Sequence, residues 1–340
     1  SLEATWKYLL ICSVGIALAL LGNLFLIVAS SLKSTPFLLS NLLKASTTFQ
    51  TDWMKVAFIL FFVGYGTKMG LSPLHTWLPD AHSEAPSMIS ALLSGALLNC
   101  AFLGILRCYQ VCVAAHLGAF AREIFLIFGI ISLLLAAFFI IKQVDFKRML
   151  AYSSVEHMGI LSFGIGIGGG ALFGSLFHAL NHSFTKASLF WISGNILALY
   201  KTKKITDVQG LKKVLPWSGV LWLLGFFAIT GTPPSSTFLS KWIILKSALA
   251  NGHYFSTFLF LLSIGLIFIG MAKVFFPMFQ GKPVPTFEPM EIKNRNSFLF
   301  LCSPTLLLTI VFLLGLYLIP GVESLLQDAV CLLEDPTCPK

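Results

Sequence analysis

The chain has 340 residues, of which 56% are hydrophobic and 11% are charged, and its formal net charge is +9. Ordinary globular domains carry about 25% charged residues, so this composition excludes an ordinary water-soluble fold. The excess of basic residues does not require nucleic acid, because lysines and arginines that flank membrane spans also give a positive net charge. We therefore expect a membrane protein that contacts the lipid bilayer and binds no nucleic acid.

Apolar runs of about 20 residues, the length that crosses a bilayer, recur along the chain and predict an all-α polytopic fold with about nine transmembrane helices. In chain order they are Trp6–Ser30, Met54–Leu71, Met88–Arg107, Glu123–Ile141, Leu150–Ile167, Leu172–Tyr200, Trp217–Ala250, Phe255–Met278 and Phe298–Ile319. We interpret residues 1–320 as a single transmembrane domain and residues 321–340 as a short tail outside the cytoplasm.

The charges of the loops predict the orientation of the chain. If the helices alternate in direction, most loop lysines and arginines lie on the side of the amino terminus, among them Lys142, Lys147, Lys203 and Lys213. Because cytoplasmic loops carry the excess of basic residues, we expect the amino terminus in the cytoplasm and the carboxyl terminus outside. The chain starts with Ser1, and no cleavable signal precedes the first helix. We therefore expect upstream sequence to be missing.

Glycine and proline interrupt two of the predicted helices. The breaks are at Gly70 and Pro73 in the second helix and at Gly231, Pro233 and Pro234 in the seventh. Such breaks free backbone carbonyls that only protein or water can satisfy at membrane depth. Because the breaks lie five helices apart, the broken helices run in opposite directions, as in the inverted repeats of transporters. We expect such a bundle, with an incomplete first repeat and a second repeat over roughly residues 123–280; ordinary proline kinks are the alternative.

Three lysines lie inside apolar segments, namely Lys68, Lys186 and Lys241. A charge at membrane depth costs several kcal/mol unless it faces a partner or a water-filled cavity, so such a residue indicates an ion or proton site. Lys68 and Lys241 also lie close to the two helix breaks, and paired discontinuous helices mark the binding site of a transporter. We therefore predict that the chain moves protons.

The predicted sixth helix carries a polar stripe. His178, His182 and Lys186 follow one another at intervals of four residues and so lie on nearly one face of the helix. Imidazole can accept and donate a proton near neutral pH, which favours a proton relay. Two histidines at this spacing can also bind a metal, but no carboxylate or cysteine completes a ligand set on that helix, so we predict no metal. Hydrogen bonding between neighbouring helices is the remaining alternative.

Five further ionisable residues are candidate accessory groups. Asp80, His82 and Glu84 follow the first break, where a solvated helix end is the alternative interpretation. Glu156 and His157 stand near the cytoplasmic end of the fifth helix, where we expect an interfacial position.

Three segments together resemble a known family. They are Lys68–His82, Asp145–Gly159 and Phe177–Lys186. They resemble landmarks of the antiporter-like subunits shared by respiratory complex I, Mrp-type cation/proton antiporters and membrane-bound group 4 hydrogenases. The Ser-Val-Glu-His sequence at 154–157 is most similar to the F component of hydrogenase-4.

The resemblance implies roles for the polar residues. Lys68 is similar to the central lysine of the half-channel through which protons enter. Lys186 resembles the lysine that links the two half-channels, with His178 and His182 as its relay. Lys241 resembles the ionisable residue that leads to the outer exit.

The sequence departs from the family pattern at two positions. The family pairs its first lysine with a glutamate on an earlier helix, which would lie upstream of Ser1. Several relatives carry a lysine in the helix where this chain has Asn99. The resemblance therefore does not supply a complete entrance for protons.

The resemblance implies a proton-translocating subunit of a hydrogenase-4-like energy-converting complex in a bacterial or archaeal cytoplasmic membrane. Its expected partners are other membrane subunits and a peripheral redox module, where nickel–iron and iron–sulfur centres would reside. The cysteines of this chain form no cluster-binding pattern, so we expect no cofactor in it. One alternative is a Mrp-type antiporter subunit, which exchanges sodium for protons. The other is a structural membrane anchor for a partner enzyme.

The carboxyl-terminal tail contains Cys331 and Cys338, separated by six residues. The predicted orientation places the tail outside the cytoplasm, where an oxidising environment lets nearby cysteines persist as a disulfide. We predict this disulfide. A pair of free thiols is the alternative, because a disulfide also requires a suitable distance and direction between the two residues.

Overall fold

The computed structural model describes residues 2–30, 37–282, 298–335 and 338. Their regular structure is helical, apart from one isolated β-bridge between Asp145 and Lys204. The longer helices are α1 (Leu2–Ser30), α3 (Thr51–Met69), α6 (Leu98–Ala114), α7 (Gly118–Ile140), α8 (Phe146–Ile167), α9 (Gly170–Tyr200), α11 (Pro216–Thr230), α12 (Ser236–Ala250), α13 (Tyr254–Gln280), α15 (Phe298–Leu316) and α16 (Pro320–Glu334). The shorter ones are α2 (Leu39–Ala45), α4 (Trp77–Glu84), α5 (Ser87–Leu92) and α10 (Leu211–Val214), with a 3₁₀ turn at Ser46–Thr48 and a π-helical turn at Leu93–Leu97.

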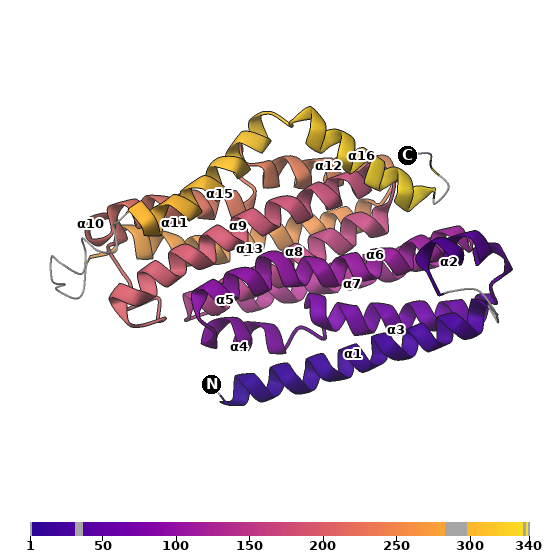
Figure 1. Ribbon diagram of the computed structural model, residues 1–340. Helices are drawn as coiled ribbons and strands as arrows, with labels where there is room; N and C mark the ends of the chain where they lie inside the picture. The colour runs from indigo at the N-terminus through magenta and orange to yellow at the C-terminus, as the bar shows by residue number, and fades with distance from the viewer. Residues whose placement is uncertain (1, 31–36, 283–297, 336–337, 339–340) are drawn as a thin grey trace.

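The long helices lie along one another in one bundle, and the two chain ends lie at opposite ends of it (Figure 1). Helix α9 occupies the middle of the bundle and packs against α5, α8, α11, α12 and α15. Helix α8 lies between α7 and α9 and packs against both. Nearly every residue of α8 is buried. The polar residues of α8 and α9 are therefore enclosed by protein.

Four helices in the described part of the chain are long and apolar enough to cross a membrane, and the bent pair α15–α16 would add a fifth. The four are Leu2–Ser30, Ser87–Ala114, Gly118–Ile140 and Tyr254–Gln280. The other segments that the sequence predicts as spans are also helical. These segments either contain a break, which shortens the continuous helix, or carry buried polar residues, which lower the mean hydropathy. The predicted number of nine spans therefore stays a prediction.

The outer surface of the bundle is apolar. Leu9, Val14 and Leu20 on α1, and Phe258 and Ile269 on α13, each expose between 49% and 62% of their surface. Isolated apolar residues are common on soluble proteins, but rows of them along long helices are typical of a lipid-facing surface. The distribution is thus the reverse of that in a soluble protein, with polar groups inside.

Small residues bring α7 and α8 into close contact. A Cβ atom added at Gly129 would lie 2.6 Å from the Phe163 backbone nitrogen, and one at Gly166 would lie 2.6 Å from the Leu126 backbone nitrogen. Only glycine allows two helix backbones to approach so closely, as is common between membrane helices.

Asp145 caps the start of α8, because its side chain accepts hydrogen bonds from the backbone nitrogens of Lys147 and Arg148.

Helices α3 and α11 end in the same way. Each is followed by a glycine in the left-handed conformation, Gly70 with φ +83° and Gly231 with φ +75°, which is the usual way for glycine to end a helix. The chain resumes helical structure at Trp77 and at Ser236. Each break contains a cis peptide bond before a proline, Pro73 in the first and Pro234 in the second.

Side chains satisfy carbonyl groups at both breaks. The Trp77 indole donates to the Thr67 carbonyl at 2.8 Å, and Lys241 Nζ donates to the Thr230 carbonyl at 3.2 Å. The Thr237 hydroxyl donates to the Ala228 carbonyl. Polar side chains therefore replace helical hydrogen bonds inside the bundle.

Most of the predicted tail, residues 321–340, is helical in the described part of the chain. Helix α16 bends by 78° from α15 and packs against α6 and α9. The Gln110 side chain donates to the Leu332 carbonyl at 3.0 Å. Cys331 and Cys338 form a disulfide, with their Cα atoms 5.9 Å apart.

Candidate functional site

Three histidines meet in the middle of the bundle. His157 comes from α8, and His178 and His182 come from α9; all three are fully buried. His157 Nδ1 lies 2.8 Å from His178 Nε2, so one ring donates a hydrogen bond to the other. The His157 ring centre is 4.9 Å from that of His182. His157 Nε2 and His182 Nδ1 have no protein hydrogen-bond partner among the described residues. The described protein residues therefore leave these two ring nitrogens open to a further hydrogen-bond partner.

Lys186 lies one turn beyond His182 on α9 and is also fully buried. Its Nζ donates to the Leu150 carbonyl at 2.7 Å and to the Ser153 hydroxyl. Both acceptors are neutral and belong to α8. A lysine held by neutral oxygens can lose its proton without leaving a carboxylate unpaired, which suits a group that transfers protons.

His182 is also linked to the π-helical turn between α5 and α6. Its Nε2 lies 3.3 Å from the Ser94 carbonyl, and the Ser94 hydroxyl lies 2.8 Å from that of Ser154 on α8. Single π-helical turns interrupt the regular backbone hydrogen bonds and occur often at functional sites. The turn thus brings a polar group of a third element to the histidines.

On the other side of the histidines, α12 continues the polar network. His178 Nδ1 lies 2.8 Å from the Ser240 hydroxyl. The next residue, Lys241, forms an ion pair with Glu156 at 3.2 Å, and the two side chains are 7% and 1% exposed. Glu156 precedes His157 directly on α8. One turn of α8 therefore contacts both the histidines and the ion pair.

The structure corrects the expected interfacial position of Glu156 and His157. The apolar run predicts that this span starts at Leu150, but α8 begins at Phe146. Glu156 thus lies ten residues beyond the first residue of α8, which is about 15 Å along the helix axis for a rise of ~1.5 Å per residue. Both residues are buried, at 1% and 0% exposure.

Three sets of contacts follow one another along α8, α9 and α12: Lys186 with Ser153, then His182, His157, His178 and Ser240, then Lys241 with Glu156. Neighbouring positions on α9 and α12 join the three sets, and we call these residues together the polar file. The predicted residues Lys186, His178, His182 and Lys241 are brought together with Glu156 and His157. Ser153 and Ser240 are additional members that the sequence does not distinguish from ordinary helix serines.

Lys68 lies apart from the polar file. Its Nζ donates to the Tyr8 hydroxyl at 2.8 Å and lies 4.4 Å from the Tyr8 ring centre and 5.7 Å from that of Trp77. Among the described residues, no carboxylate forms an ion pair with it. An aromatic face and a hydroxyl stabilise a cation, so Tyr8 is a contact of Lys68 that the sequence alone does not reveal.

Asp80, in the first turn of α4, and Glu84, the last residue of α4, form ion pairs. Asp80 binds Lys7 at 3.0 Å and Arg148 at 3.1 Å, and Glu84 binds Lys203 at 3.0 Å. All five side chains are between 21% and 42% exposed. Pairs this exposed contribute little to stability, and they agree with the alternative of a solvated helix end.

His82, by contrast, is fully buried and stacks on Phe190 with 5.0 Å between ring centres. Neither of its ring nitrogens has a protein hydrogen-bond partner among the described residues.

Lys147 is 1% exposed and donates to the Ala85 carbonyl at 2.6 Å. From the sequence, we count Lys147 among the loop charges, because the apolar run begins at Leu150, after this lysine. The apolar run does not reveal Asp145 as the residue that caps the start of α8, so the predicted span misses the first turn of the helix.

Asn99 ties two helices together. Its side-chain nitrogen donates to the Ala179 carbonyl at 3.0 Å and to the Ser183 hydroxyl at 2.7 Å. Both acceptors lie on α9. Hydrogen bonds of this kind are a common link between membrane helices.

The described residues contain no group of three or more histidines, cysteines or carboxylates that could hold a metal ion.

The break at Gly231 positions Lys241, and a substitution can test this. A Cβ atom at Gly231 would lie 3.0 Å from Lys241 Cδ. Gly252 has a similar φ of +77° but nothing within 4 Å of an added Cβ. We expect Gly231→Ala and Gly252→Ala to lose similar stability, about 1–2 kcal/mol each for an alanine in this conformation. Only Gly231→Ala should also lower proton translocation in vesicles, by several-fold. Equal translocation in both variants would contradict this role.

An all-α bundle that encloses a file of lysines, histidines and a carboxylate defines a class of protein, the polytopic membrane subunits that translocate ions. Residues 1–267 match the family described as NADH:quinone oxidoreductase/Mrp antiporter, transmembrane. The chain belongs to this family.

Curated relatives agree with this assignment. The hydrogenase-4 component F homolog of Methylacidiphilum infernorum is 39% identical over 98% of this chain and 70% of that protein. Hydrogenase-4 component B of Escherichia coli is 36% identical over 56% of this chain and 30% of that protein. The D component of a Na(+)/H(+) antiporter from Alkalihalophilus pseudofirmus is 30% identical over 85% of this chain and 58% of that protein. The chain therefore spans part of the length of each relative.

Solved structures share the fold. A chain of the Mrp complex from a Dietzia species superposes with a TM-score of 0.87 at 20% identity, over 99% of this chain and 69% of that one. A chain of respiratory complex I from Thermus thermophilus with bound NADH gives a TM-score of 0.81 at 25% identity, over 98% and 69%. Both are multi-subunit membrane complexes.

Proposed function

We propose that this chain is a proton-translocating, antiporter-like membrane subunit of a hydrogenase-4-like energy-converting complex. The observation that carries the proposal is the buried polar file from Lys186 to Glu156. Every group in it is enclosed by helices, and the histidine nitrogens and hydroxyls both donate and accept hydrogen bonds. Such a file can pass a proton from one group to the next.

The middle of the file is best suited to transfer. His157 and His178 share a hydrogen bond of 2.8 Å. When one ring binds a proton, it can pass the proton of this hydrogen bond to the other ring, which then releases a proton on its far side. Lys186 at one end and Lys241 at the other are held by α8. Lys68, which is held by Tyr8, is the proposed group on the entrance side.

A ring replacement tests the relay. His157→Phe keeps a ring of similar size but removes both nitrogens, so it should reduce proton translocation by on the order of 100-fold, the usual contribution of a positioned proton-transfer group. The measurement is the pH change inside vesicles that contain the purified assembly. His253→Asn, outside the polar file, is the control and should retain translocation. Unchanged translocation in His157→Phe would refute the relay.

The proposed partners are other membrane subunits and a peripheral redox module. Nickel–iron and iron–sulfur centres belong to that module in the proposal, which assigns none to this chain. The likeness to hydrogenase-4 components favours a redox complex, whereas the likeness to an antiporter component favours a Mrp-type sodium/proton antiporter. Identification of the partners in the purified native assembly separates these two. A structural anchor remains if the polar file can be replaced without loss of activity.

We propose that the amino terminus lies in the cytoplasm and the carboxyl terminus outside. The positions of the chain ends at opposite ends of the bundle (Figure 1) and the basic loops support this orientation. The proposed membrane is the cytoplasmic membrane of a bacterium or an archaeon. In the proposal, as the family resemblance implies, Lys68 is the group on the entrance side, Lys186 links the two halves of the path, and Lys241 leads toward the outside.

The disulfide of the tail gives an independent test of the orientation. We expect non-reducing mass spectrometry to recover Cys331 and Cys338 as one cross-linked peptide. Their Cα distance of 5.9 Å lies in the usual range of about 4.4–6.8 Å, and an oxidising compartment preserves such bonds. Ready labelling of both thiols without reductant would contradict the bond.

A further inference from the structure

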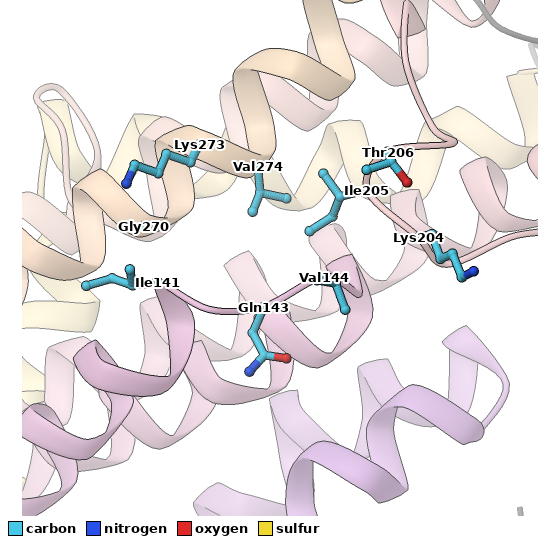
Figure 2. A pocket seen from close by; sticks show the side chains of 9 residues that line it. All are labelled: Ile141, Gln143, Val144, Lys204, Ile205, Thr206, Gly270, Lys273 and Val274. Carbon is cyan, nitrogen blue, oxygen red and sulfur yellow. The ribbon is translucent and has the colours of Figure 1, made fainter.

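A pocket opens at the end of α7, between the turn that follows this helix, the segment 204–206 and α13 (Figure 2). Its volume is about 450 Å³. The turn between α7 and α8 forms one wall, the segment 204–206 a second and α13 a third. The lining residues are Ile141, Gln143, Val144, Lys204, Ile205, Thr206, Gly270, Lys273 and Val274. None of them is acidic.

The walls of this pocket are fixed by backbone contacts. The Ile205 nitrogen donates to the Val144 carbonyl at 3.0 Å, and the Phe146 nitrogen donates to the Lys203 carbonyl at 3.2 Å. On the third wall, a Cβ atom at Gly270 would lie 2.9 Å from Ile140 Cγ2, so glycine lets α13 approach the end of α7. The pocket is therefore a built feature of the fold.

The pocket combines an apolar interior with basic ends. Val144 is 73% exposed and Ile141 is 39% exposed, although both are aliphatic. Lys204 and Lys273 lie at opposite ends of the pocket in Figure 2, and neither forms an ion pair with any described residue. An occupant that matches these features is apolar along its length and negatively charged at its head.

The expected level of the pocket in the membrane further limits which molecules could occupy it. Helix α7 is one of the helices that could cross a membrane, and the pocket lies where it ends. At that level the hydrocarbon core gives way to the headgroups, and basic pockets between membrane helices bind anionic lipid headgroups there. A soluble anion would leave the apolar wall unused, and a neutral lipid would leave the lysines without a counter-charge.

We propose that this pocket binds an anionic phospholipid. Its acyl chain covers Ile141, Val144 and Ile205, and its phosphate lies at the rim between the two lysines, which attract it from either end of the pocket. The proposal is independent of the proton file, because none of the residues of the pocket belongs to it.

Lipid titration of the purified assembly tests the proposal. After removal of copurified lipid, the assembly is titrated with phosphatidylglycerol or with phosphatidylcholine of the same acyl chains, and bound lipid is counted by native mass spectrometry. Lys204→Gln combined with Lys273→Gln should weaken phosphatidylglycerol binding about 30-fold, since each lysine near the surface contributes ~1 kcal/mol. Phosphatidylcholine binding should not change. Val144→Asp should weaken both lipids.

The matched control is Lys212→Gln combined with Lys213→Gln, which removes the same charge from exposed lysines of α10. It should leave phosphatidylglycerol binding within twofold of the wild type. An equal loss in this control would mean general surface attraction and would overturn the proposal. Equal binding of both lipids by the wild type would overturn it as well, and so would a photo-cross-linker at Val144 that captures a neighbouring protein chain instead of lipid.

Discussion

Replacing Lys186 with alanine is expected to abolish proton translocation while the protein still assembles. Lys186 is fully buried, and among the described residues its amine donates hydrogen bonds to the neutral oxygens of Leu150 and Ser153. Its removal leaves two acceptors unsatisfied, at a cost of about 1–3 kcal/mol each, but leaves no charge unpaired. Translocation should fall at least about 100-fold, the contribution of a positioned proton-transfer group. The pH change inside vesicles measures translocation, and gel electrophoresis of the native complex measures assembly.

A second substitution separates charge from proton transfer. Lys186→Arg keeps the positive charge, but guanidinium does not release its proton inside proteins, so translocation should be lost here too. Lys55→Gln, which removes a half-buried lysine of α3 outside the polar file, is the control for the loss of one charge and should translocate normally. Full activity in Lys186→Arg would show that the charge alone is sufficient.

Breaking the Lys241–Glu156 pair is expected to destabilise the protein more than replacing both residues. The two side chains are 7% and 1% exposed and lie 3.2 Å apart. Glu156→Leu alone strands the buried lysine, and loss of one partner of a buried pair costs about 3–5 kcal/mol. Glu156→Leu combined with Lys241→Met removes both charges and should restore stability to within about 1 kcal/mol, because apolar replacement of a buried pair is often neutral. Thermal unfolding of the purified assembly measures this.

Translocation should be absent from the single and the double variant alike, because neither retains the carboxylate and amine together at this end of the file. The double variant is therefore stable and inactive, a combination that a purely structural ion pair cannot give. If the double variant pumps at the wild-type rate, the pair holds the fold and does not carry protons.

Periodicity along one helix is what the sequence predicts well. The four-residue spacing of His178, His182 and Lys186 places them on one face of α9, and the structure directs that face to α8 and α12. The fold class, two discontinuous helices included, follows from apolar length and from glycine and proline.

Contacts between helices are not predictable in this way. Glu156 and His157 are assigned to the interface because the sequence does not reveal where α8 begins, and a shift of four residues moves both toward the centre. Likewise, Lys68 can be placed in a helix, but not beside Tyr8, which is sixty residues away in the chain. Such pairs depend on which helices pack together, and periodicity within one segment carries no information on that.

The close contact of α7 and α8 limits how this protein can work. Their backbones touch through glycines at Gly129 and Gly166, with no space for a side chain between them. A helix in such contact cannot slide or roll without separating from its neighbour, so α8 acts as a fixed rail that holds one side of the polar file. If the polar file translocates protons as proposed, we expect access to it to change through side-chain rotation and through the making and breaking of the Lys241–Glu156 pair, without a movement of α8 against α7.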